Sequence, residues 1–286
     1  MRIFLFGASG QVGTEVNLLP TDHEIIPITR AQADLLVPGT AASLIEDEKP
    51  DMIVNAAAYT NVDGAEEEIE TAARINEGAV GEIAATAKKI GAGLIHISTD
   101  YVFDGHGTIP IKETSATAPL NVYGQSKLDG EKTALENCPN AVILRTSWVY
   151  SAHGNNFVKT MLRLAKDRDE LSIVADQIGG PTPAWAIAKA ALQIADALGS
   201  GATNKGVYHF QGKPPTSWAD FAAEIFAAAD VDVSVTKIPT SDYKTPAQRP
   251  LYTVLDCSRI LRDFGIEQPD WQADIRSLVT KLRKQL

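Results

Sequence analysis

Tyr123 and Lys127 lie four residues apart in the segment YGQSK, a spacing that places both side chains on one face of a helix. A phenol has an ordinary pKa of about 10, and a neighbouring ammonium group favours the phenolate. Such a phenol can protonate the alkoxide that develops when a carbonyl carbon receives a hydride. The pair therefore predicts a carbonyl reductase with Tyr123 as the proton donor and Lys127 as its partner, which also hydrogen-bonds the nicotinamide ribose. The alternative is an ordinary surface pair.

Thr99 is the third candidate catalytic residue. It ends a predicted strand in the run HISTDYVF, and the carboxyl ends of strands in an open α/β sheet face the ligand crevice. We expect its hydroxyl to polarise the substrate carbonyl beside Tyr123. The alternative is a strand-end hydroxyl that bonds its own backbone.

A glycine-rich loop at the start of the chain predicts a dinucleotide site. Gly7, Gly10 and Gly13 in GASGQVG follow an apolar strand and open a helix. Glycines allow a tight turn and close approach of a pyrophosphate, and the helix N-terminus offers free N–H groups. The spacing is GxxGxxG and not the usual GxGxxG, so three glycines of an ordinary turn remain the alternative.

The residues after the second strand bear on which dinucleotide is used. Arg30 stands where a carboxylate would favour NAD, and a guanidinium suits a 2′-phosphate. This favours NADPH, but a solvated surface arginine is the alternative, so NADH stays open. Asp34 and Leu35 follow, near the expected adenine. The run NAAA at 55–58 ends the third strand, where small side chains let a ribose-phosphate lie close.

Apolar strands alternate with amphipathic helices along the first half, which predicts a Rossmann-type, doubly wound parallel sheet of the α/β class. We expect strands at 2–7, 24–29, 52–57, 93–99, 141–146, 171–175 and 207–210. We expect helices at 11–19, 41–48, 65–91 (as one helix or two), 123–137, 155–167, 184–198, 217–229 and 274–286. The predicted dinucleotide domain is 1–150, rejoined by 179–211. The predicted smaller, mainly C-terminal α/β substrate lobe is 151–178 with 212–286.

Composition limits the classes of partner. A net charge of −10 and a pI near 5.0 argue against nucleic acid or an anionic membrane surface as the main partner. Two cysteines give neither a disulfide framework nor a metal cluster. No segment has the length and apolarity of a membrane span or a secretion signal, so we expect a soluble cytoplasmic protein.

Seven motifs occur in the order GxxGQVG, NAAAYTNVD, STDYVFDG, PLNVYGQSK, LRTSWVY, NNFVKTMLRLAKDRDEL and DQIGGPT. Together they resemble the dTDP-4-dehydrorhamnose reductase family over essentially the whole chain. The resemblance implies NAD(P)H-dependent reduction of the C4 keto group of dTDP-4-dehydro-L-rhamnose. It implies a catalytic triad of Thr99, Tyr123 and Lys127. The implied cofactor contacts are Gly10, Gln11, Val12, Asp34, Leu35, Ala56, Ala57, Ala58, Tyr59 and Thr60. The implied substrate contacts are Val62, Asp100, Trp148, Asn155, Asn156 and Phe157, with Trp148 packing on the sugar ring.

The sequence departs from this family at one place. Some members form a dimer bridged by magnesium through interface glutamates, one of which matches Glu15. The second falls on Trp185, which cannot coordinate a hard cation. We therefore expect no metal site, and a monomer or a homodimer that magnesium does not bridge.

Two alternatives to this function remain at the level of sequence. One is a reductase or epimerase of another nucleotide sugar on the same scaffold, which would share the triad. The other is a non-catalytic regulatory subunit that keeps the cofactor site, as some relatives of this fold do. The intact triad argues against the second.

Overall fold

The computed structural model describes residues 1–283, and its centre is a parallel six-stranded sheet. The strand order is β10-β5-β4-β3-β1-β2, so the winding direction reverses between β1 and β3. In sheets of this type, ligands bind outside the carboxyl ends of the strands at such a reversal. The strands are β1 (Arg2–Phe6), β2 (Glu24–Ile28), β3 (Met52–Asn55), β4 (Gly93–Thr99), β5 (Val142–Thr146) and β10 (Gly206–His209).

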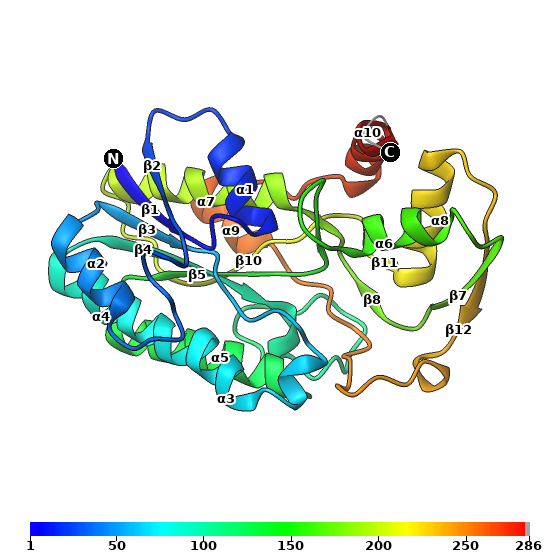
Figure 1. Cartoon of the computed structure of the whole chain (residues 1–286), viewed down its shortest axis with the longest axis horizontal. Coiled ribbons are helices and arrows are strands. Elements are labelled where there is room, and N and C mark those ends of the chain that lie inside the picture. Colours follow the sequence, from blue (N-terminus) through cyan, green and yellow to red (C-terminus); the bar gives the residue numbers. More distant parts are fainter. Residues whose placement is uncertain (284–286) are drawn as a thin grey trace.

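Helices cover both faces of this sheet (Figure 1). One face carries α1 (Gln11–Leu18), α7 (Ala184–Gly199) and α9 (Ser258–Phe264). The other carries α2 (Thr40–Glu48), α4 (Ala79–Ile90) and α5 (Val122–Asn137). Successive strand residues point to opposite faces, so Leu5 packs with the first set of helices and Phe4 with the second. Both faces of the sheet are therefore shielded from water, which explains why the strands are apolar almost throughout.

A smaller lobe extends from one end of the sheet (Figure 1) and has its own apolar core. It contains α6 (Phe157–Leu164), α8 (Trp218–Ala229), α10 (Trp271–Arg283), and β7 (Glu170–Val174) paired in parallel with β12 (Ser234–Ile238). Phe221 and Trp271 are buried at its centre. Two short pairs join neighbouring segments: β6 (Val149–Tyr150) with β9 (Thr182–Pro183), and β8 (Ile178–Gly179) with β11 (Thr216–Ser217).

The α/β fold class predicted from the sequence is confirmed, and the strands of the central sheet begin and end within two residues of their predicted bounds. Ser217 caps α8, as its sequence position indicated. The predicted helix 274–286 begins earlier, at Trp271, and its last three residues lie outside the described part of the chain. The structure also contains β12 and α9, which the sequence analysis did not predict.

The segment predicted as a helix over 65–91 is broken into pieces. They are η1 (Gly64–Glu66), α3 (Ile69–Ala73), a π-helical turn η2 (Arg74–Gly78), and α4. The buried Asn76 in this turn bonds the backbone of Tyr59 at both N–H and C=O, at 2.9 and 3.1 Å. It also donates to Ser126 of α5 at 3.0 Å. The π turn therefore ties the segment after β3 to the helix that carries Tyr123. Two further short helices are η3 (Asp100–Val102) and η4 (Thr240–Asp242).

The division into two domains stays a prediction. Residues 184–199 and 206–209 pack with the central sheet, in the range expected to rejoin the first domain. Side chains on and beside α9, such as Ile260 and Ile266, also lie in the core of the sheet.

Candidate active site

The glycine loop joins β1 to α1 and fits tightly against the end of β3. Gly7 has φ = 76°, and a Cβ there would lie 2.5 Å from the Ala57 nitrogen. A Cβ on Gly13 would lie 2.2 Å from the Gly7 carbonyl oxygen. Gly10 is the N-cap of α1, which has neither a side-chain cap nor an acidic residue in its first turn. The first N–H groups of α1 are thus left for an anion, as a pyrophosphate requires.

Gln11, the first residue of α1, connects this loop to the lobe. Its Oε1 accepts hydrogen bonds from Ser151 Oγ at 3.2 Å and Asn156 Nδ2 at 2.9 Å, and its Nε2 donates to the Val149 carbonyl at 3.4 Å. Val12 is buried in the core beneath the loop. The predicted cofactor residue Gln11 therefore also holds the start of the lobe.

Arg30 and Asp34 meet after β2. Arg30 Nε lies 3.0 Å from Asp34 Oδ2, and the arginine side chain is largely exposed. The pKa of Asp34 is lowered, first by the hydrogen bond from the Leu36 N–H and second by Arg30. Leu35 packs against the core between the sheet and α2. The guanidinium of Arg30 is thus exposed just after β2, the edge strand of the central sheet.

The segment after β3 forms the floor between the glycine loop and Tyr123. Ala56 donates its N–H to the Phe6 carbonyl at 3.0 Å, and Ala57 packs against the core, whereas Ala58 is partly and Thr60 largely exposed. Tyr59 and Val62 pack around Tyr123 in a small apolar cluster. The predicted cofactor and substrate residues thus meet in one continuous segment.

Tyr123 and Lys127 project from the first two turns of α5 and are almost fully buried. Asn121 caps this helix, accepting from the Gly124 N–H at 2.8 Å. Gly124 is required because a Cβ there would lie 2.3 Å from the Tyr101 carbonyl oxygen. The start of α5 therefore packs closely against the end of β4, where Thr99 lies.

The expectation that Lys127 lowers the pKa of Tyr123 is wrong for this structure. Burial raises the pKa of Tyr123 to about 12, and Thr99 only partly opposes the shift. Lys127 Nζ is instead 2.8 Å from the Ile97 carbonyl oxygen and 3.2 Å from His96 Nε2. Burial lowers the pKa of Lys127 to about 8, against an opposing effect of Glu131.

Asp100 follows Thr99 and is also buried. Its Oδ1 accepts from Thr99 Oγ1 at 3.1 Å, while the buried Oδ2 has no hydrogen-bond partner among the described residues. Burial raises the pKa of Asp100 to about 6. A buried acceptor without a partner beside the catalytic hydroxyls fits a hydroxyl group of a substrate.

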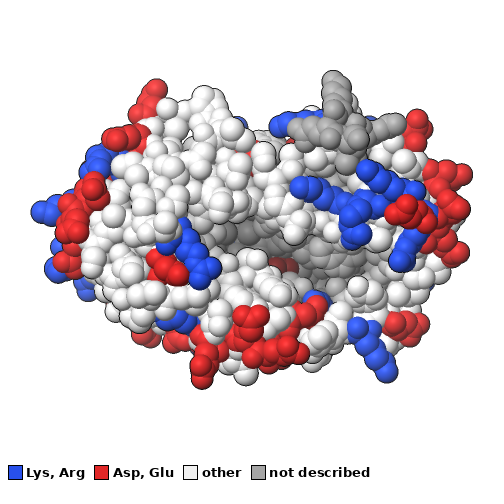
Figure 2. Space-filling model, viewed as in Figure 1, with Lys and Arg blue, Asp and Glu red and all other residues white. Residues whose placement is uncertain are grey.

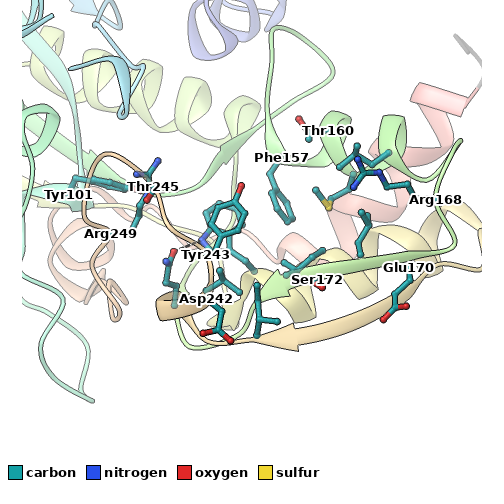
Figure 3. A pocket seen from close by; sticks show the side chains of 18 residues that line it. Tyr101, Phe157, Thr160, Arg168, Glu170, Ser172, Asp242, Tyr243, Thr245 and Arg249 are labelled. Atoms are coloured by element: carbon teal, nitrogen blue, oxygen red, sulfur yellow. Dashed lines mark hydrogen bonds between the residues drawn. The ribbon is translucent and has the colours of Figure 1, made fainter. Parts of the chain in front are cut away.

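A cavity of about 880 Å³ opens in the lobe next to these residues (Figure 3). Tyr101 lies in its wall, and the Tyr101 and Tyr123 rings meet edge to face with centroids 5.5 Å apart. Phe157, which the sequence predicts as a substrate residue, lines the cavity. Other lining residues were not predicted from the sequence, including Tyr101, Arg168, Trp218, Tyr243 and Arg249. Tyr101 stands inside STDYVFDG and Arg168 inside NNFVKTMLRLAKDRDEL, whereas Trp218, Tyr243 and Arg249 lie outside the seven motifs.

The other predicted substrate residues occupy less direct positions. Trp148 has φ = 46° and stacks on Trp218, with ring centroids 3.6 Å apart, so one of its faces is already covered. Asn156 caps α6 through the Lys159 N–H at 3.1 Å. Asn155 is exposed and, with Asn156, lines a separate cavity of about 470 Å³.

The surface is hollowed between the sheet and the lobe (Figure 2). Basic side chains gather over α6 on the lobe side of this hollow, and acidic ones lie over the α3 region opposite. Arg163, Lys166 and Arg168 are exposed on and after α6. Positive charge beside the cavity suits a negatively charged ligand, although the net charge of the whole chain is −10.

The two positions compared with a magnesium-bridged dimer have other partners here. Trp185 Nε1 donates to Asp274 Oδ1 at 2.6 Å, and Glu15 lies 3.7 Å from His153 Nε2. Within residues 1–283, His, Cys, Asp and Glu form no group able to hold a metal ion. Cys138 and Cys257 are buried and unpaired by any disulfide. No helix in the described range is both long and apolar enough to cross a membrane.

The fold and this arrangement of Thr99, Tyr123 and Lys127 define a protein of the short-chain dehydrogenase/reductase type. A family profile described as the RmlD substrate binding domain matches residues 1–284. The chain belongs to this family.

Its relatives carry consistent names. A protein of Burkholderia thailandensis named dTDP-4-dehydrorhamnose reductase is 45% identical over the full length of both chains. The structure of a dTDP-4-dehydrorhamnose reductase of Clostridium acetobutylicum has a TM-score of 0.94 at 37% identity, covering 99% of this chain and 100% of that one. That of Bacillus anthracis, in complex with NADP, has a TM-score of 0.91 at 35% identity, covering 98% and 99%.

Proposed function

We propose that this chain reduces the C4 keto group of dTDP-4-dehydro-L-rhamnose to dTDP-L-rhamnose with NAD(P)H. The observation that carries the proposal is the meeting of Thr99, Tyr123 and Lys127 at the end of β4, beside a cavity of about 880 Å³. The names of full-length relatives at 42–45% identity supply the substrate.

The residues at the glycine loop fit a dinucleotide. Gly7 and Gly13 leave room that a Cβ would fill, and the uncapped start of α1 offers N–H groups to a pyrophosphate. Arg30 is the residue that would hold a 2′-phosphate, which favours NADPH over NADH. When bound, the nicotinamide supplies the hydride.

Tyr123 acts as the acid of the reaction. Because its pKa is raised to about 12, the phenol is protonated at neutral pH and can give its proton to the developing alkoxide. The Thr99 hydroxyl gives its one proton to Asp100 Oδ1 in the structure and would turn it to the carbonyl oxygen of the substrate in order to polarise that group. Tyr59, Val62 and Tyr101 keep water away from the phenol.

The nucleotide sugar would occupy the lobe cavity. Arg168 in its wall suits the diphosphate, and Phe157 and Trp218 offer apolar surface. Trp148 stacks on Trp218 of this wall, and Asn156 caps α6, the helix that begins with Phe157. Since NADPH and nucleotide sugars are intracellular compounds, the proposal includes a cytoplasmic location.

The test is NADPH absorbance decay with enzymatically generated dTDP-4-dehydro-L-rhamnose, with the product identified by NMR. Rapid oxidation that gives dTDP-L-rhamnose supports the proposal. Cofactor binding without any oxidation contradicts it and points first to another keto-sugar nucleotide. A protein inactive with every such substrate would be a regulatory subunit.

A further inference from the structure

The segment 239–252, which we call the strap, leads from β12 of the lobe towards α9 on the central sheet. At the lobe end, the Thr240 N–H donates to the Asp176 carboxylate at 2.9 and 3.0 Å. At the sheet end, the Tyr252 N–H donates to the Gly105 carbonyl oxygen at 3.0 Å. Between these two anchors the strap supplies three residues of the cavity wall, namely Tyr243, Thr245 and Arg249.

Asp63, which ends the motif NAAAYTNVD after β3, holds the strap between its anchors. Its Oδ1 and Oδ2 accept from Arg249 Nη1 and Nη2 at 2.5 and 2.8 Å, and Oδ1 also accepts from the Ala247 N–H at 3.1 Å. Arg249 Nη1 donates in addition to the Ala247 carbonyl oxygen at 2.6 Å. A pair of parallel hydrogen bonds from a guanidinium to a carboxylate fixes direction as well as distance. Asp63 therefore sets the orientation of Arg249 in the cavity wall.

The strap is also bonded to the start of α5. Asn121 Nδ2 donates to the Gln248 carbonyl oxygen at 2.7 Å, while Asn121 Oδ1 caps the helix at the Gly124 N–H. Tyr123 stands in the first turn of this helix. Residues 247–249 are thus held from the segment after β3 and from the helix that carries the predicted proton donor.

Arg249 and Tyr101 lie together at one side of the cavity, and Arg168 lies at the other (Figure 3). The Tyr101 ring meets the Tyr123 ring edge to face at 5.5 Å, so this side is the one next to the phenol. A keto group must come within hydrogen-bond reach of Tyr123 to receive its proton. The side with Arg249 is therefore where the sugar and the phosphate joined to it would lie.

Arg249 keeps donors for a ligand at this place. A guanidinium has five N–H groups, and the bonds to Asp63 and Ala247 use three of them. Burial disfavours its charge, but Asp63 and Tyr101 outweigh that effect and raise the pKa of Arg249. The guanidinium is thus a charged donor whose direction is fixed before a ligand arrives.

We propose that Asp63 is a positioning residue for the nucleotide sugar: through Arg249 it fixes the strap as the cavity wall beside Tyr123. The inference rests on the proposed function and assigns a residue that acts through another. A wall that is already ordered spares a ligand the entropy of ordering it, so losing the Asp63 charge should weaken binding at the sugar end.

The first test needs no substrate and uses Asp63→Asn, which keeps the size of the side chain and removes its charge. Hydrogen exchange by NMR on the full chain follows the amide of Ala247. We expect it to exchange about tenfold faster or more in the variant, because the strap opens more often. The Gly124 amide, capped by Asn121, should keep its rate and show that α5 is intact. An unchanged rate at Ala247 would overturn the proposal.

The second test compares dTDP-L-rhamnose with dTMP, which lacks the sugar and the phosphate joined to it. Calorimetry with saturating NADPH measures both affinities. We expect Asp63→Asn to weaken dTDP-L-rhamnose by about tenfold or more and dTMP by less than about threefold. In turnover, KM should rise while kcat stays within about threefold. Equal weakening of both ligands would mean general damage to the fold and would overturn the proposal.

A double-mutant cycle tests whether Asp63 acts through Arg249. If it does, Asp63→Asn should add little to the loss of dTDP-L-rhamnose affinity caused by Arg249→Met. Additive losses would show that the two residues act separately, and the proposal would fail.

Asp263→Asn is the matched control. Asp263 of α9 likewise accepts from an arginine and is mostly buried, but it is not part of the cavity wall. It should leave both affinities unchanged. A wild-type protein that binds no dTDP-L-rhamnose would contradict the proposed function, whereas exchange at Ala247 separately decides whether Asp63 holds the strap.

Discussion

Asp100 and Lys127 are ionisable side chains buried in the fold, and at neutral pH their charged forms lower its stability. The pKa of Asp100 is raised to about 6 and that of Lys127 is lowered to about 8, in each case first by burial. In both residues burial favours the neutral form, so each group is held in a state that suits proton chemistry near neutrality. Such destabilised groups are common where function conflicts with stability.

Replacing Asp100 by Asn should therefore stabilise the protein at pH 7.5. A folded pKa above the unfolded one contributes stability that is full below about pH 4 and is lost as the pH rises through about 6. Raising the pKa of a carboxyl group from 3.8 to about 6 corresponds to about 3 kcal/mol, so we expect the free energy of unfolding to rise by about 1–3 kcal/mol. Urea unfolding at pH 7.5 and pH 4 measures it. A gain of the same size at both pH values would contradict this explanation.

Tyr123→Phe removes the acid and keeps the ring. We expect turnover to fall by about 100- to 10,000-fold, since a positioned proton donor contributes on that order. NADPH affinity, measured by fluorescence titration, should stay within about threefold. Near-normal turnover would exclude Tyr123 as the donor.

At the level of elements, the glycine loop was readable from the sequence because its geometry depends on missing side chains. Gly7 leaves no room for a Cβ beside Ala57, so the loop after β1 lies directly against the residues that follow β3 at the reversal point. The strands were readable because burial on both faces makes them apolar throughout. The π turn around Asn76 could not be predicted from the sequence, because it depends on hydrogen bonds to Tyr59 and Ser126, which are distant along the chain.

Gly7→Ala and Gly91→Ala form a matched pair that tests the loop. The two glycines have φ angles of 76° and 77°, but a Cβ at Gly91 meets nothing within 4 Å. Both variants should lose about 1 kcal/mol to the left-handed conformation. Only Gly7→Ala should also lose NADPH binding, by tenfold or more in a fluorescence titration, together with a larger drop in Tm. Equal effects of both changes would show that the close approach to Ala57 is unimportant.

At the level of the whole molecule, the candidate site lies where the central sheet and the lobe meet. Its catalytic part and its cavity wall differed in how well the sequence predicted them. The predicted catalytic residues lie at the end of β4 and in the first two turns of α5, which the sequence pattern located. The residues of the cavity wall could not be located in this way, because they come from segments that only the folded chain brings together, such as those of Arg168, Tyr243 and Arg249. Arg249, for example, binds Asp63 across 186 positions of the chain. No local pattern encodes such a pairing.

Chelation should leave the molecule unaffected. Trp185 and Glu15 are engaged with Asp274 and His153, and the chemistry proposed for Tyr123 needs no metal. We expect EDTA to change neither the rate nor the mass measured by light scattering. A dimer that dissociates on chelation would show that a magnesium bridge forms through other residues.

Gln11 lies in the first turn of α1 and accepts hydrogen bonds from Ser151 and Asn156 at the start of the lobe. A dinucleotide bound at that turn would hold Gln11 in place and so restrict the motion of the lobe segment that the sugar nucleotide contacts. We therefore expect an ordered mechanism, in which the dinucleotide binds first and leaves last. Product-inhibition kinetics should show the oxidised dinucleotide competing with NADPH alone, and Gln11→Ala should make the order random. Random order in the wild-type enzyme would rule this out.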